Sequence, residues 1–202
     1  MESTLKKYLW IFIPVFIVIL IIIVCVSGYN SLVEKQQNAE QAWAQVENQY
    51  QRRADLIPNL VNTVKGYAAH ESETFEKVTL ARAKATSITI DAENLTEENL
   101  AQYQAAQNEL SQALKSLLAV TEAYPDLKAA ENFKDLQAQL EGTENRIATE
   151  RRTYTKAVKD YNTSIKKFPG NIYAGWFDFE VLPQFKAEEG AQKAPEVFQS
   201  GF

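Results

Sequence analysis

The chain begins with an uncharged apolar run. From Tyr8 to Gly28 it reads YLWIFIPVFIVILIIIVCVSG, without one charged residue. A helix of about 20 apolar residues spans the hydrocarbon core of a bilayer. The run therefore predicts a transmembrane helix over 8–28, preceded by a short cytoplasmic N-terminus over 1–7. The anchor residues expected to face lipid are Trp10, Ile11, Phe12, Pro14, Phe16, Ile19 and Ile22.

Two other interpretations of this run fit less well. A cleaved signal peptide has a shorter apolar stretch of about 7–15 residues, although residues 26–28 would suit its cleavage site. A lipoprotein would use Cys25, but bulky residues precede it where small ones are needed. An uncleaved anchor is therefore predicted. Because Lys6 and Lys7 precede the run, the positive-inside rule places the N-terminus in the cytoplasm and residues 29–202 outside it.

After the anchor, apolar and small residues recur at steps of three and four, which is the pattern of an amphipathic helix. This pattern predicts one helix over 29–85 that continues directly from the membrane span. Thr96 is a good N-cap for a second helix over 97–124. A third helix, over 126–168, has an aromatic or aliphatic residue at every seventh position. These residues are Phe133, Leu140, Ile147, Tyr154, Tyr161 and Phe168.

The predicted fold class is all-α, with the transmembrane helix continuing into an antiparallel bundle of three to four helices over 29–168. Left-handed coiled-coil-like packing is expected. Residues 169–202 form a tail that, with Phe168, contains eight of the chain's 22 aromatic residues. A disordered tail avoids aromatics, so we expect docking on its own bundle, a neighbouring subunit or a membrane surface. The docking residues would be Phe168, Tyr173, Trp176, Phe177 and Phe179.

The predicted lengths leave part of the first helix uncovered. A helix over 29–85 is about 85 Å long and one over 97–124 about 42 Å. The third helix would then start level with about residue 57, and an apolar stripe near the membrane would face water at a cost. We expect other subunits to cover this stretch as a self-association stalk, which makes the protein a homo-oligomer. The stalk residues are Leu32, Ala39, Trp43, Val46, Tyr50 and Arg53.

Two alternatives to the stalk remain open. The returning tail covers the stripe, or the first helix breaks near Gly66 and the chain folds into four shorter helices. Pro58 is expected to kink the first helix where stalk and bundle meet. Arg53 either forms a buried polar layer or extends its guanidinium to water. Glu144 and Arg151 in the third helix raise the same question.

The sequence has few groups for catalysis or metal binding. His70 is the only histidine and Cys25 the only cysteine, which excludes an HExxH zinc site, a paired di-iron motif and an intrachain disulfide. Nucleophile-elbow, P-loop and dinucleotide-binding motifs are absent as well. A net charge of −5 disfavours nucleic acid as a partner. We therefore expect no enzymatic activity and no cofactor, and a metal only if His70 and Glu73 bind one.

Several segments resemble the LemA family of small bacterial membrane proteins. They are YNSLV at 29–33, AWAQVENQYQRRADLIPNLVNTVKGYAAHE at 42–71, ENFKDLQAQLEGTENRIATERRTY at 131–154, KDYNTSIKKFPGNIYAGWFDF at 159–179 and the terminal PEVFQSGF. Thr155 departs from the family, which commonly has asparagine there. The resemblance implies one anchor in the bacterial inner (cytoplasmic) membrane and a helical bundle on its periplasmic side. It implies no established enzymatic activity. Members of the family are often linked with envelope maintenance, with a membrane metalloprotease or with the shaping of internal membranes.

These observations lead to three hypotheses about function. The first is a membrane-anchored scaffold or interaction protein of the bacterial cell envelope, whose partners are the lipid bilayer and its own copies. The second is an adaptor or regulator of a membrane enzyme such as a protease, which needs another membrane protein as its partner. The third is a small-ligand or metal-binding bundle, which needs a polar cavity around His70 or Glu144.

Overall fold

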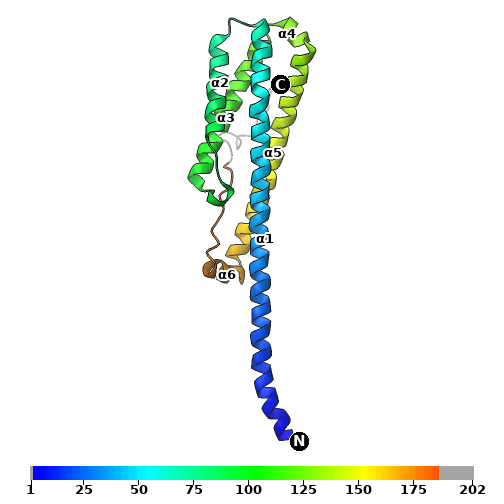
Figure 1. Ribbon diagram of the computed structural model, residues 1–202, viewed down its shortest axis with the longest axis vertical. Helices are drawn as coiled ribbons and strands as arrows, with labels where there is room; N and C mark the ends of the chain where they lie inside the picture. Colours follow the sequence, from blue (N-terminus) through cyan, green and yellow to red (C-terminus); the bar gives the residue numbers. More distant parts are fainter. Residues whose placement is uncertain (1, 187–202) are drawn as a thin grey trace, which may run out of the picture.

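The computed structural model describes residues 2–186, and places the side chains of residues 12–186 apart from that of Glu93. Its dominant element is α1 (Glu2–Tyr67), which runs unbroken from the apolar N-terminal run to the far tip of the bundle (Figure 1). The other elements are α2 (Ser72–Ser87), the short 3-10 helix η1 (Ala92–Asn94), α3 (Glu97–Thr121), α4 (Pro125–Ala129), α5 (Glu131–Lys166) and α6 (Gly170–Trp176). No strand occurs over residues 2–186, and the all-α prediction is confirmed.

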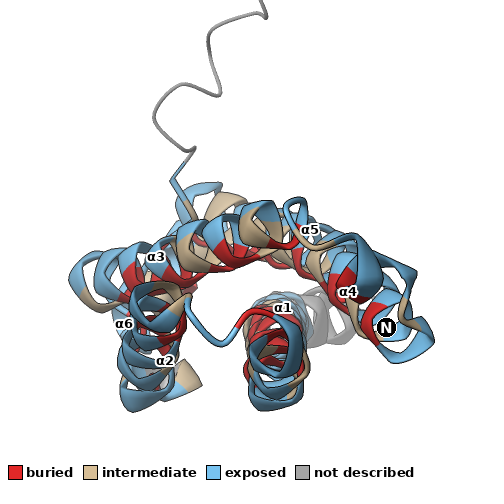
Figure 2. Cartoon of the chain, turned by 90° about the horizontal axis from the view of Figure 1, so that it is seen from above, coloured by how far each residue is buried: buried red, intermediate tan, exposed pale blue. Residues whose placement is uncertain are grey.

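The four long helices alternate in direction. Helices α1 and α3 run away from the N-terminal end, and α2 and α5 run back toward it (Figure 1). Seen along the rod, α2, α3 and α5 form a curved layer beside α1 (Figure 2). Helix α1 packs most extensively against α5, and α2 against α3. The bundle is therefore two antiparallel helix pairs packed against each other.

The prediction of one helix over 29–85 was wrong. Helix α1 ends at Tyr67 and α2 begins at Ser72. The backbone N–H of Glu71 donates to the carbonyl oxygen of Ala68 at 3.1 Å, which closes a tight turn between them. The structure therefore has the alternative in which the first helix breaks near Gly66. The predicted helix over 126–168 is likewise divided, because Ala130 separates α4 from α5.

The break removes the uncovered stalk. From Tyr29 to Tyr67 α1 is about 58 Å long and α5 about 54 Å, so α5 returns alongside α1 almost to the end of the membrane span. The six predicted stalk residues are each at most 4 % exposed within a single chain. The expectation that this stretch lacks an intrachain partner was therefore wrong, and the argument for self-association through it no longer holds.

The core changes character along the rod. Its upper part is mostly aliphatic and joins α1, α2, α3, α4 and α5 around residues such as Leu60, Val78 and Leu117. Its middle part is aromatic and centres on Trp43. Its lower part, near the membrane span, joins Leu32 to residues of α5 and α6. The buried residues thus form three successive clusters along the bundle.

Pro58 remains inside a continuous α1 because another helix supplies the hydrogen bond that it removes. A proline has no N–H to donate to the carbonyl oxygen four residues earlier, here that of Ala54. In its place, Nε of Arg82 in α2 donates to the Ala54 oxygen at 2.8 Å. Ala54 is buried, whereas Pro58 is exposed. The proline therefore frees a backbone acceptor in α1, and α2 binds to it.

This arrangement predicts a dependence between two substitutions. Arg82→Ala should lower the free energy of unfolding by about 1–3 kcal/mol, because the buried Ala54 carbonyl loses its donor. In a Pro58→Ala background the same substitution should cost less, since alanine restores the helical N–H. Urea unfolding of the four proteins in detergent measures both costs. Equal costs in the two backgrounds would contradict the assignment.

Candidate functional site

Among the side chains that the structure describes, which exclude that of Glu93, Arg53 is the one charged residue that is fully buried. Its Nη1 donates to Oε1 of Glu144 in α5 at 2.8 Å and to Oγ of Ser111 in α3 at 2.7 Å. Its Nη2 donates to the side-chain oxygen of Gln107 at 2.6 Å. The guanidinium carbon also lies 5.1 Å from the ring centroid of Tyr50. One side chain of α1 therefore binds both α3 and α5, as a buried polar layer.

The two partners of this ion pair differ in their contact with water. The Arg53 side chain is 1 % exposed, whereas that of Glu144 is 42 % exposed. Glu144 and Ser111 line an open groove of about 940 Å³ between α3 and α5. Arginine stays protonated at any accessible pH and cannot exchange a proton in catalysis. Arg53 can therefore fix the register of three helices, and it cannot itself act as a catalytic acid or base.

An aromatic cluster lies below this layer. Trp43 is fully buried, and its ring centroid lies 5.5 Å from Tyr103 of α3 and 5.5 Å from Tyr154 of α5. Both contacts are edge-to-face, an arrangement that the ring quadrupoles favour. Burial raises the pKa of the Tyr103 and Tyr154 hydroxyls above the ordinary range. These tyrosines therefore remain neutral and serve as packing and hydrogen-bonding groups.

The segment after α6, residues 177–186, turns back toward the middle of the bundle, and we name it the strap (Figure 1). It has no helical structure beyond its first residues, so other groups must satisfy its backbone. Side chains of α5 and α3 supply these partners. The Tyr161 hydroxyl donates to the carbonyl oxygen of Glu180, and the Tyr154 hydroxyl donates to that of Pro183. Asn162 exchanges two hydrogen bonds with the backbone of Leu182. Gln104 of α3 donates to the carbonyl oxygen of Lys186.

The strap also contributes to the aromatic cluster. Phe185 stacks on Trp43 with ring centroids 6.0 Å apart, and the guanidinium of Arg151 lies 4.5 Å from the Phe185 ring centroid. Arg151 therefore covers the strap from the α5 side. The strap therefore links α3 and α5 through its backbone and contacts α1 through Phe185.

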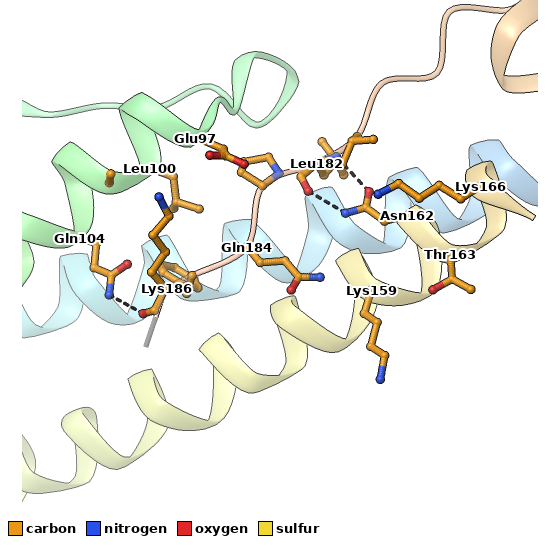
Figure 3. Close-up of a pocket in the computed structure, with 14 residues that line it drawn as sticks. Glu97, Leu100, Gln104, Lys159, Asn162, Thr163, Lys166, Leu182, Gln184 and Lys186 are labelled. Atoms are coloured by element: carbon orange, nitrogen blue, oxygen red, sulfur yellow. Dashed lines mark hydrogen bonds between the residues drawn. The ribbon is translucent and has the colours of Figure 1, made fainter. Parts of the chain in front are cut away.

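A groove of about 530 Å³ lies beside the strap, between α3 and α5 (Figure 3). Its wall includes the amides of Gln104 and Asn162, which the strap already uses, and the exposed side chains of Lys159 and Lys166. Thr163 is the one hydroxyl group among its lining residues, which include no histidine or cysteine. The groove offers hydrogen bonds and positive charge, with Glu97 as the one carboxylate among its lining residues.

The predicted tail residues divide into two groups. Tyr173 is buried against α1 and α5, and Phe179 is half-buried with its ring centroid 5.7 Å from that of Tyr29. Phe168, Trp176 and Phe177 are exposed. Within a single chain the structure thus docks part of the predicted set. The terminal aromatics, Phe198 and Phe202, lie outside the described residues.

The anchor prediction concerns the lower half of α1. Within the described residues, α1 is the one helix long and apolar enough to cross a membrane. Phe12, Pro14, Phe16, Ile19 and Ile22 are exposed there, and the side chains of Trp10 and Ile11 lie outside the described ones.

His70 and Glu73 lie near the turn between α1 and α2, and both are exposed. Glu73 is paired with Lys77 at 2.6 Å. The described part of the chain contains no group of three histidine, cysteine or acidic residues that could hold a metal. Glu144 is occupied by Arg53. The geometry therefore gives no support to the metal-binding alternative at either place.

The residues that hold the strap and the polar layer have little signature in the sequence. Gln104, Gln107 and Asn162 are amides on helices, where they resemble residues of a solvated face. Tyr154 and Tyr161 are the exception, because they belong to the seven-residue row of α5 and each has a hydroxyl that needs a partner when buried. That requirement was the available signal for a segment packed against α5.

Glu47 provides a pH test of the middle of the bundle. Burial, together with the carboxylate of Asp91, raises the pKa of Glu47 above its ordinary value of 4.5. The folded protein therefore binds this proton more tightly than the unfolded chain, so stability should fall as pH rises from about 4.5 through the raised pKa. Glu47→Gln should flatten this part of the pH profile of urea unfolding. An unchanged profile would contradict the assignment.

Comparison with known proteins tests the family. A model of the LemA family matches residues 42–198, which is more than half of the chain. Magnetosome proteins MamQ 1 and MamQ 2 from Paramagnetospirillum magneticum are each 27 % identical over 207 residues, covering 93 % of this chain and 76 % of each relative. Protein LemA from Metamycoplasma hominis is 23 % identical over 184 residues, covering 91 % of this chain and 80 % of that protein. The resemblance found in the sequence is thus confirmed, and the chain belongs to the LemA family.

Proposed function

We propose that this protein is a membrane-anchored scaffold of the bacterial cell envelope, which binds other proteins and performs no catalysis. The observation that carries the proposal is the unbroken helix α1 from Glu2 to Tyr67. The same helix supplies the apolar span and the central wall of the bundle core. Without a flexible linker, the bundle is held at a fixed height and angle on its anchor, which suits a protein that presents a binding surface.

The chemistry of the described residues supports binding in preference to catalysis. The fully buried charge, Arg53, is engaged with three side chains of α3 and α5. Two open grooves lie between α3 and α5 and are lined mainly by amide, lysine and carboxylate side chains, and the Ser111 hydroxyl in the second donates to the Gln107 backbone oxygen. Such surfaces suit recognition of another polar protein surface.

The bundle is expected to lie on the periplasmic side of the inner membrane, because Lys6 and Lys7 flank the start of the apolar run. Asn38 is exposed on α1 above the span. In a Cys25→Ser background, Asn38→Cys should react with a membrane-impermeant maleimide in intact spheroplasts. If the introduced cysteine reacted only after the spheroplasts were lysed, the bundle would lie on the cytoplasmic side, which contradicts the proposed orientation.

Self-association, as part of this proposal, uses the sides of the bundle. Above the level of α6, the large apolar side chains exposed among the described residues are those of Tyr67, Leu80 and, on the strap, Val181. Stable homodimers have more apolar interface cores than this. Contacts between copies are therefore polar and individually weak, and confinement to one membrane raises the effective concentration at which they act.

Photo-crosslinking in cells tests the proposal. A benzophenone amino acid is placed in the full-length protein at Gln112 beside the α3–α5 groove, at Leu80 on α2 or at Asn59 on α1, all exposed positions. Crosslinks between copies from one face support the scaffold. A recurrent adduct with one other membrane protein supports the adaptor alternative instead. No light-dependent adduct from any face would contradict an interaction function.

A further inference from the structure

Three exposed aromatic residues and one isoleucine lie beside α1, on the side of α6, where the apolar span enters the bundle (Figure 1). Phe168 is 81 % exposed, Trp176 67 %, Phe177 54 % and Ile172 37 %. We name these four residues the collar. Ile172 and Trp176 are four residues apart in α6, so they share one side of it, and Phe168 lies in the turn just before this helix. Large apolar side chains gathered at this exposure mark an interaction site.

The opposite side of α6 fixes the collar at the end of the span. Tyr173 packs in the lower core with Leu32 and Cys25 of α1. A Cβ atom on Gly28 would overlap the Tyr173 ring, so glycine at this position provides the room for α6. The ring centroid of Phe177 lies 4.7 Å from that of Tyr29. Helix α6 is therefore held level with residues 25–32, at the last turn of the apolar run.

The exposed surface of α1 identifies what the collar meets. From Phe12 to Val26 every large apolar side chain of α1 is exposed, and it is this segment that is apolar enough to cross a membrane. The collar lies beside this apolar surface, because α6 and Phe177 contact residues 25–32 of α1 directly. The bilayer that covers the span therefore ends at the height where the collar lies.

The charges beside the collar are balanced. Lys166 and Lys167 precede it, and Asp178 and Glu180 follow it, all exposed. The attraction to a membrane is therefore apolar, not electrostatic. Tryptophan is favoured at the boundary between hydrocarbon and headgroups, where its amphipathic ring contacts both, and phenylalanine is common on the apolar face of helices that lie in this boundary. This composition matches a neutral lipid surface and requires no anionic lipid.

We propose that the collar inserts into the headgroup boundary of the bilayer and forms a second membrane attachment beside the anchor. The span holds the bundle to the membrane, and the collar sets its tilt, because α6 touches the bilayer to one side of α1. This proposal does not rest on the scaffold function, since it concerns only how the bundle is positioned on the membrane surface.

Fluorescence of Trp176 tests the proposal on the full-length protein. The chain has three tryptophans, and Trp10→Phe leaves the buried Trp43 and the exposed Trp176. The protein is reconstituted in vesicles of palmitoyl-oleoyl-phosphatidylcholine that contain lipid brominated either near the start or near the end of an acyl chain. Insertion at the boundary predicts strong quenching by the shallow bromines, weaker quenching by the deep ones and weak quenching by acrylamide in the water.

Two control variants identify the signal. Adding Trp176→Phe should abolish the bromine quenching, because Trp43 is shielded in the core. Adding Leu80→Trp to that protein places a tryptophan on α2, far above the span, where acrylamide alone should quench it. Circular dichroism of each variant shows that the helices are retained.

Three results would overturn the proposal. Trp176 quenched by acrylamide and not by brominated lipid lies in water. Trp176 shielded from both, more so as the protein-to-lipid ratio rises, is covered by a second copy. Bromine quenching that survives Trp176→Phe does not come from the collar.

Discussion

Trp43→Ala is expected to lower the free energy of unfolding by about 3–5 kcal/mol, the range for truncating a fully buried large aromatic side chain. Trp43 is 0 % exposed and contacts Tyr103, Tyr154 and the strap residue Phe185. The substitution leaves a cavity where four segments of the chain meet. Urea unfolding of the detergent-solubilised protein, followed by far-ultraviolet circular dichroism, measures the loss.

Trp176→Ala is the matched control, because Trp176 is the same residue type at an exposed position. In detergent it should change the unfolding free energy by less than about 0.5 kcal/mol. Trp43→Ala should also release the strap, so protease cleavage near Phe185 should accelerate in that variant alone. Similar effects of the two alanine substitutions would show that Trp43 is not the centre of the core.

Arg53→Ala is expected to cost about 3 kcal/mol or more, because it removes a buried side chain and leaves its polar partners without a donor. Gln107 is buried and cannot regain water, whereas Glu144 is partly exposed and can. The loss therefore arises mainly on the α3 side of the layer. The same unfolding experiment measures it.

Two further variants separate the charge of Arg53 from its volume. Arg53→Met leaves the same polar partners without a donor but keeps most of the volume, so it should cost less than alanine because it creates a smaller cavity. Glu144→Gln should cost less than Arg53→Ala, since its amide oxygen still accepts from Arg53 and only the compensating negative charge is lost. A larger loss from Glu144→Gln than from Arg53→Ala would place the energetic centre on α5 instead.

The sequence was sufficient for the features that depend on local pattern. The uncharged run from Tyr8 predicted the span, and Thr96 marked the start of α3. The row of residues seven apart predicted the buried face of α5 from Phe133 to Tyr161, whereas its last member, Phe168, is exposed beyond the end of that helix. Each of these signals is contained within one element. Helical periodicity and capping operate over a few residues and can be recognised without knowing the partner.

The break between α1 and α2 was harder to predict. The turn contains Ala68 and Ala69, which are strong helix formers, and the apolar stripe resumes at Phe75 in the same rhythm. Gly66 was the one local signal. The error mattered, because a continuous helix over 29–85 exposes the stripe around Trp43, whereas a helix that ends at Tyr67 lets α5 cover it.

The remaining site residues depend on contacts between distant segments. The Ala54 carbonyl that Pro58 frees is bound by Arg82, and Arg53 is bound by Gln107 and Ser111. The strap has no periodicity, because its backbone is held by side chains of α3 and α5. The aromatic composition of the tail predicted that it would pack against another surface. Only the structure distinguishes Tyr173, which is buried against the bundle, from Trp176, which is exposed.

The central claim is that anchor and bundle form one rigid body through α1. Spin labels at Ile19→Cys in the span and Gln41→Cys in the bundle, both exposed positions, are introduced in a Cys25→Ala background and measured in lipid nanodiscs by double electron–electron resonance. A continuous helix predicts one narrow distribution centred at about 33 Å between the labelled backbone positions. A broad distribution, or one shifted to clearly shorter distances by a hinge at Ser27 and Gly28, would contradict the account.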